Sequence, residues 1–63
     1  MRFRLNNNIH YAANIEIAYE TIDRWCEHNG YTRTETVEWA NCYVIHICKD
    51  DVEHHIKVYK NGY

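Results

Sequence analysis

Hydrophobic and polar residues alternate most clearly in the last third of the chain, from Asn41 to Tyr63. Because successive side chains of a strand point to opposite faces, this alternation predicts two strands with one apolar face each. Lys49-Asp50-Asp51 stands between them, and aspartate tolerates the backbone geometries of tight turns. The stretch is therefore predicted to form a β-hairpin whose two-residue loop is Asp50-Asp51.

This loop determines which residues of the two strands lie opposite each other. Lys49 would face Val52, and the other pairs follow by counting away from the turn. The predicted pairs on the apolar face are Ile47–His54, Ile45–Ile56 and Tyr43–Val58. The predicted pairs on the other face are Cys48–Glu53, His46–His55, Val44–Lys57 and Cys42–Tyr59. A slip of one residue would place isoleucines opposite polar residues, so this register is favoured.

The beginning of the chain predicts a strand followed by a helix. Phe3 and Leu5 alternate with arginines, which indicates a short strand over residues 1–6 with one buried face. Apolar residues then recur at helical spacing, at Ile15, Ala18, Tyr19, Ile22, Trp25 and Cys26. The helix is expected to end at Asn29-Gly30, because glycine readily adopts the left-handed conformation.

The start of this helix has two interpretations. Asn8 can cap a helix that begins at Ile9, and this is the interpretation that we favour. In the alternative, residues 9–12 pair with the first strand, and Asn14 caps a shorter helix.

Residues 31–41 predict a further strand, because threonine alternates there with larger residues and strand-forming types are frequent. A three-residue connection with a left-handed Asn41 would place Trp39 opposite Tyr43 and Val37 opposite Ile45. The expected order is β-α-β-β-β. This is an α+β fold in which one amphipathic helix packs on one face of a small antiparallel sheet.

The length of 63 residues predicts a single domain, residues 1–63, of modest stability. One core of this size supplies about 3–5 kcal/mol, so a homodimer is an attractive source of further stability. Six tyrosines and two tryptophans exceed what a small core can hide, which favours a contact surface. Three cysteines without a CxxC pair, no long apolar run and no signal peptide indicate a cytoplasmic protein away from membranes.

The predicted helix carries a row of acidic residues on its polar side. They recur at helical spacing, and they are Glu16, Glu20, Asp23 and Glu27. Because like charges at this spacing repel each other, such a row suits a basic partner surface, although an ordinary solvated face would look the same. Ile17 lies beside the row and would add an apolar contact.

The sheet face away from the helix offers an alternative site for nucleic acid. Basic and aromatic residues of the kind that hold single strands would gather there: Arg2, Arg4, Lys57 and Tyr59. The formal net charge of −2 and the lack of an aromatic RNA-binding motif argue against this use.

The same face offers an alternative zinc site on the C-terminal hairpin. Its candidate ligands are His46, His55, Cys48 and Glu53, since a cross-strand pair can bring two imidazoles to one ion. Their spacing matches no zinc motif, and exposed histidines on a solvated strand are the simpler interpretation. His54 points to the other face, where a histidine at the core edge is expected.

Catalysis and cofactor binding are not expected. A Cys48–His46 pair would lack a cleft, oxyanion donors and a third group to orient the base, and no glycine-rich phosphate loop is present. The sequence therefore predicts a small non-enzymatic protein-binding module, in the manner of phage or mobile-element inhibitors. Its acidic helix face would bind a host protein such as a nucleic-acid-handling enzyme. A nucleic-acid-binding regulator and a zinc-binding module are the alternatives.

Overall fold

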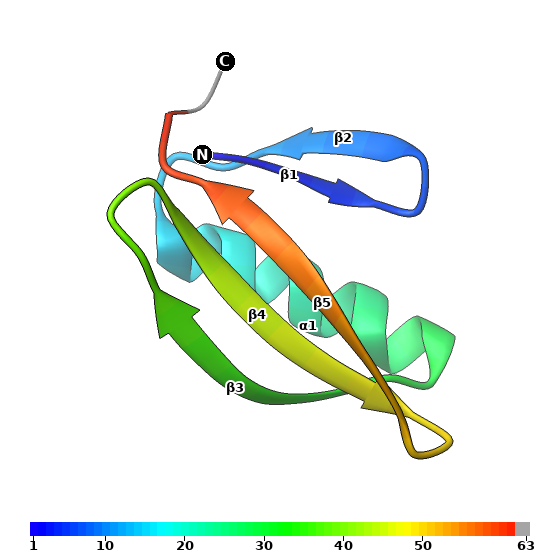
Figure 1. Ribbon diagram of the computed structural model, residues 1–63. Helices are drawn as coiled ribbons and strands as arrows, with labels where there is room; N and C mark the ends of the chain where they lie inside the picture. The colour runs from blue at the N-terminus through cyan, green and yellow to red at the C-terminus, as the bar shows by residue number, and fades with distance from the viewer. Residues whose placement is uncertain (62–63) are drawn as a thin grey trace.

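The computed structural model describes residues 1–61, and its sheet is centred on the C-terminal hairpin (Figure 1). β4 (Cys42–Lys49) and β5 (Val52–Tyr59) pair antiparallel at eight positions. Asp50 and Asp51 have φ angles of 53° and 63°, and two consecutive positive φ angles are the signature of a type I′ turn. The register predicted from the sequence is confirmed on both faces of this hairpin.

A second hairpin extends the sheet beyond β5. β1 (Arg2–Leu5) pairs with β2 (Asn8–Tyr11), and the strand order is β2-β1-β5-β4-β3. The preferred helix start at Ile9 is therefore wrong, and the alternative strand pairing is correct. Asn6, with a φ of 57°, allows the chain to turn back tightly, and residues 8–11 then gain a paired backbone beside β1.

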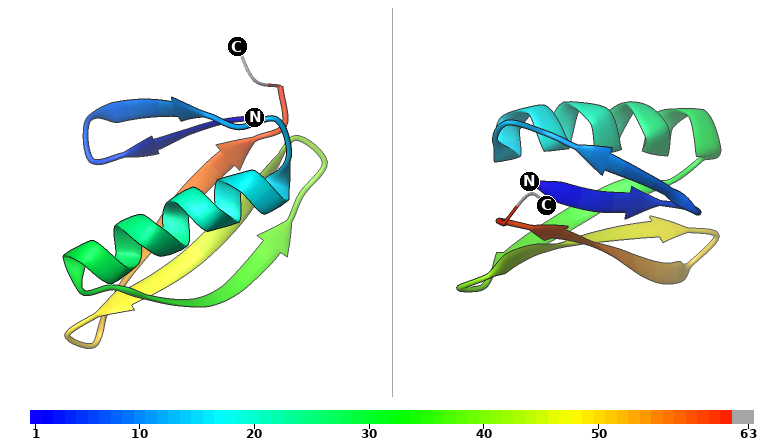
Figure 2. Two further views of the ribbon diagram at one scale, coloured as in Figure 1. Left: turned by 180° about the vertical axis from the view of Figure 1, so that it is seen from behind. Right: turned by 90° about the horizontal axis from the view of Figure 1, so that it is seen from above.

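The helix α1 (Ile15–Asn29) begins after Asn14, whose side-chain Oδ1 accepts a hydrogen bond from the Ile17 N–H at 2.9 Å. It ends at Gly30, which has a φ of 79°, as predicted for a left-handed glycine. Figure 2 shows α1 as one layer and the sheet as the other. The core between the layers consists of Phe3, Leu5, Ala12, Ala18, Ile22, Cys26, Ile45, Ile47, Ile56 and Val58.

β3 (Thr32–Glu38) forms the far edge of the sheet, one residue out of the predicted register. Val37 pairs with Val44, so the predicted Val37–Ile45 and Trp39–Tyr43 pairs are wrong. The turn is also placed differently: the Trp39 N–H donates to the Cys42 carbonyl at 2.8 Å, and the Trp39 side chain is 60% exposed. A left-handed Asn41 is also wrong, because positive φ angles outside glycine occur among residues 1–61 only at Asn6, Asp50 and Asp51.

The α+β class is confirmed, with one helix on one face of an antiparallel sheet, and β2 is the strand that the predicted order lacked. Within the described residues, no helix has the length and apolar character needed to cross a membrane.

Candidate functional site: a cationic cleft between β1 and β5

The sheet is incomplete where β1 meets β5. The two strands pair at Arg2–Tyr59 and Phe3–Val58, and from this shared end they diverge (Figure 1). Continuing the same register would place Arg4 directly opposite Lys57. Like charges directly opposite each other destabilise a strand pair, so the sequence supplies a physical reason for the strands to separate at this point.

Backbone groups of β5 face the resulting gap. In a two-residue hairpin the residues that flank the turn exchange both hydrogen bonds, so even-numbered residues of β5 bond to β4. The Lys60 N–H continues this series by donating to the Asn41 carbonyl at 2.9 Å. The odd-numbered residues Glu53, His55 and Lys57 therefore direct their N–H and C=O groups away from β4. Within residues 1–61, Glu53 and His55 have no strand partner on that side, and Lys57 lies next to the last pair with β1, Phe3–Val58.

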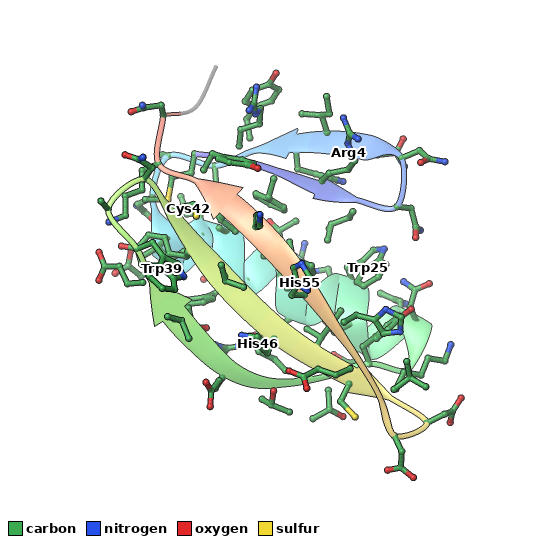
Figure 3. All side chains as sticks on the ribbon, viewed as in Figure 1. Arg4, Trp25, Trp39, Cys42, His46 and His55 are labelled. Atoms are coloured by element: carbon green, nitrogen blue, oxygen red, sulfur yellow. The ribbon has the colours of Figure 1, made fainter. Side chains whose placement is uncertain are left out.

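The gap is a cleft of about 730 Å³ whose lining is apolar inside and cationic at the rim. Buried residues of the core form its inner part, among them Phe3, Leu5, Ile47 and Ile56. The cationic side chains and histidines around it are Arg2, Arg4, Lys57, His54 and His55. None of the aspartates and glutamates among residues 1–61 lines the cleft. Figure 3 shows Arg4 and His55 on the two sides of the gap, with Trp25 on α1 beyond it.

One end of the cleft is built from stacked aromatic rings. Trp25 of α1 stacks on Tyr31 with ring centroids 5.0 Å apart, and His54 meets Tyr31 edge-on at 5.5 Å. The Lys49 ammonium lies 5.3 Å from the centre of the Tyr31 ring. His54 thus lies on the helix side, as predicted, but it is exposed at the mouth of the cleft. These contacts hold the aromatic wall in place through packing across three elements.

The positive character of the cleft results from charge segregation along the chain. Residues 1–15 and 54–63 contain four lysines and arginines and no aspartate or glutamate. All nine acidic residues, with only three lysines and arginines, fall within residues 16–53. Because β1, β2 and most of β5 come from the first group, they form a cationic region in a chain of net charge −2.

The alternative nucleic-acid residues are brought together by this arrangement. Arg2, Arg4, Lys57 and Tyr59 all line the cleft, and the Arg2 guanidinium lies 5.2 Å from the centre of the Tyr59 ring. Sequence reasoning missed Trp25 and Tyr31 as part of the same site. Trp25 shows only the helical apolar spacing, which indicates core packing and carries no signal for a cleft.

The zinc candidates are neighbours that do not converge on one point. His46 Nδ1 lies 2.9 Å from Glu53 Oε1, and the His46 and His55 ring centroids are 6.4 Å apart. Cys48 lies opposite Glu53. Residues 1–61 contain no group of three or more histidine, cysteine or acidic side chains placed to hold a metal ion.

The acidic row on α1 is divided by an ion pair. Arg33 Nε donates to Asp23 Oδ1 at 2.7 Å and its Nη2 to Oδ2 at 3.2 Å, while its guanidinium lies 4.5 Å from the centre of the Tyr19 ring. A bulge in β3 after Arg33 accompanies this arrangement. The exposed members of the row are Glu16, Glu20 and Glu27. Ile17 beside them is 42% exposed.

A second ion pair joins the end of β3 to Lys60, the residue that follows β5. Lys60 Nζ lies 2.7 Å from Glu38 Oε2 and 4.9 Å from the centre of the Tyr43 ring. The hydrogen bond from Lys60, together with its charge, lowers the pKa of the Glu38 carboxyl. In the core, burial raises the pKa of the Cys26 thiol, which keeps this sulfur protonated and unreactive.

Comparison with known proteins adds no template for this site. No protein-family model, no curated protein and no solved structure matches the chain. The function must therefore be argued from the cleft itself: its cations, its aromatic wall and the backbone groups of β5 that face it.

Proposed function

We propose that this protein is a non-enzymatic binding module that holds an acidic segment of another protein in the cleft between β1 and β5. The observation that carries the proposal is the composition of the lining. Among residues 1–61 it contains three lysines and arginines and two histidines but no aspartate or glutamate, although acidic residues outnumber basic ones in the whole chain. Complementary charge of this kind speeds association and selects the partner.

An acidic protein segment suits the cleft better than a nucleic acid does. The free edge of β5 presents N–H and C=O groups, and these match the backbone of another polypeptide. A nucleic-acid strand that extended past the wide end of the cleft would approach the β4–β5 turn, where Asp50 and Asp51 are exposed (Figure 1). These carboxylates would repel its phosphates, whereas a short acidic segment can end before them.

The exposed part of the acidic row supports a second candidate function within the same class. Glu16, Glu20 and Glu27 are exposed beside Ile17, and together they would bind a basic surface of a partner protein. Inhibition of a host enzyme, as in phage proteins of this size, would be one consequence of such stoichiometric binding. The pairing of Asp23 with Arg33 weakens this candidate, because it neutralises one of the four charges.

Titration with three defined probes distinguishes these functions. The probes are a glutamate-rich peptide, a lysine-rich peptide of equal length and a single-stranded oligothymidylate. We expect the glutamate-rich peptide to bind most tightly and to weaken as salt is raised from 50 to 200 mM, because added ions screen the charges. Preferential binding of the oligothymidylate would favour the nucleic-acid alternative, and preferential binding of the lysine-rich peptide would favour the acidic helix face.

Matched charge-reversal variants then locate the site. The double variant Arg4→Glu with Lys57→Glu should abolish binding of the glutamate-rich peptide. The double variant Glu16→Lys with Glu20→Lys changes as many charges on the helix and should leave that binding intact. Circular dichroism checks that both variants are folded. Retained binding by the cleft variant would contradict the proposal.

A further inference from the structure

We infer that the bound segment enters the cleft as an extended strand that pairs with the free edge of β5 at His55 and Lys57, with acidic and apolar side chains in alternation. This inference rests on the proposed function and adds the binding mode and the sequence pattern of the partner. Strand addition to a sheet edge is a recurring way in which proteins bind extended peptides.

The backbone geometry supports strand addition at this edge. Tyr59 belongs to the series of odd-numbered β5 residues whose N–H and C=O groups face away from β4, and it has Arg2 of β1 opposite it. Lys57 continues the series where β1 begins to diverge, His55 continues it beyond that point, and both line the cleft. An added strand would supply their hydrogen-bond partners and continue the ladder that β1 leaves unfinished.

The side chains on the two sides of the cleft specify the pattern of the incoming strand. Arg4 and Lys57 belong to the sheet face away from α1, whereas Ile56 and Trp25 lie on the side of α1. A strand between them would point successive side chains to these two sides in turn. Acidic residues would meet the two cations, and the residues between them would meet the apolar side.

Electrostatics also favours an acidic occupant at this position. Arg4 and Lys57 are the residues that a continued β1–β5 register would set against each other. A carboxylate placed between them would attract both, so binding would remove the repulsion that opposes closer approach of the strands. The same reasoning predicts that Lys57→Glu lets β1 pair further along β5. β1 itself would then occupy the edge that the partner strand needs.

Three capped hexapeptides test the binding mode on the unmodified protein. The first alternates glutamate and valine, the second has the same composition in two blocks, and the third is the alternating peptide with N-methyl groups on alternate amides. We expect the alternating peptide to bind at least about tenfold more tightly than the other two, since a single net hydrogen bond is worth on the order of a tenfold change. Amide exchange measured by NMR should slow at His55 and Lys57 when the alternating peptide binds.

The outcomes separate this inference from the proposed function. Equal binding of all three peptides, or unchanged exchange at His55 and Lys57, would overturn strand addition while leaving the acidic partner in place. Binding of the oligothymidylate without binding of any acidic peptide would overturn both. The variant Lys57→Glu should lose the alternating peptide, whereas Arg24→Glu, the same charge change at an exposed helix residue, should retain it. Equal loss in both variants would show that only overall charge matters and would contradict the inference.

Discussion

The two edges of β5 differ in how far they are paired. On one edge β4 pairs with it at eight positions, and on the other β1 pairs with it at two. On the β4 edge the turn and the apolar pairs support the same register, with Ile45 opposite Ile56. On the β1 edge the register includes the apolar pair Phe3–Val58, but the next pair would place Arg4 opposite Lys57. One pair of like charges at the next position explains why this ladder stops and why part of the strand edge stays unpaired.

The incomplete edge is nevertheless anchored. Phe3 and Leu5 are 2% and 3% exposed, so β1 buries its apolar side chains in the core even where it has no strand pairing with β5. The backbone edge is therefore open while the side chains beneath it are packed. Such an arrangement positions a cleft without the cost of ordering a mobile loop when a partner binds.

The largest expected difference is between β4 and β2, in the free energy of unfolding that is lost when a side chain is truncated. Ile45→Ala truncates a fully buried residue of β4 and should cost about 2–5 kcal/mol, enough to unfold much of a domain this small. Ile9→Ala is the matched control in β2, where the side chain is 50% exposed, and it should change stability by no more than about 0.5 kcal/mol. Urea unfolding measures both. Similar losses would show that the Ile9 side chain of β2 is as much a part of the core as that of Ile45.

Hydrogen exchange should report the open edge as an alternation along β5. The amides of His54 and Ile56 bond to β4, whereas those of His55 and Lys57 face the cleft. With a global stability of about 3–5 kcal/mol, the first two should exchange at least about 100-fold more slowly than the second two. NMR-detected exchange at neutral pH measures these rates. Equal protection at all four residues would mean that the edge is closed and would remove the basis for strand addition.

The smallest expected effect is on stability at low pH, and it involves the ion pair between Glu38 and Lys60. The pKa of Glu38 is lowered by its hydrogen bond with Lys60, so this carboxylate stabilises the folded state above its unfolded pKa of about 4.3. That contribution is lost as the pH falls through the lower pKa of the folded state. Glu38→Gln should therefore show a shallower loss of stability below about pH 4 than the unmodified protein. If both proteins lose stability equally as the pH is lowered in acid-denaturation curves, the Glu38–Lys60 pair contributes nothing to stability.

Local patterns predicted the parts of the fold in which neighbouring residues decide the outcome. The two aspartates set the turn of the β4–β5 hairpin, and alternation then set its register, so all eight pairs follow from a stretch of eighteen residues. Gly30 similarly predicted the end of α1. The helix start was wrong because Ile9 fits both a helical stripe and a strand, and pairing with β1 decided between them.

The register of β3 also depended on more than the local pattern. Apolar matching favoured Val37 opposite Ile45, but Thr36 takes that place and buries a hydroxyl oxygen that has no hydrogen-bond partner. Such a group costs on the order of 1–3 kcal/mol. The bulge in β3 lies directly before Thr36, and Arg33 at its start pairs with Asp23 of α1. Contacts between β3 and α1 are invisible to strand alternation alone.

The sequence by itself determined the central hairpin, the class of the fold and the distribution of charge along the chain. Only the tertiary structure decided that β1 lies beside β5 and brings Arg4 near Lys57 across more than fifty residues of sequence. The physical reason is that hairpins and caps depend on residues close together in the chain. The cleft depends on where a long-range strand pairing begins and on the like charges at which it ends.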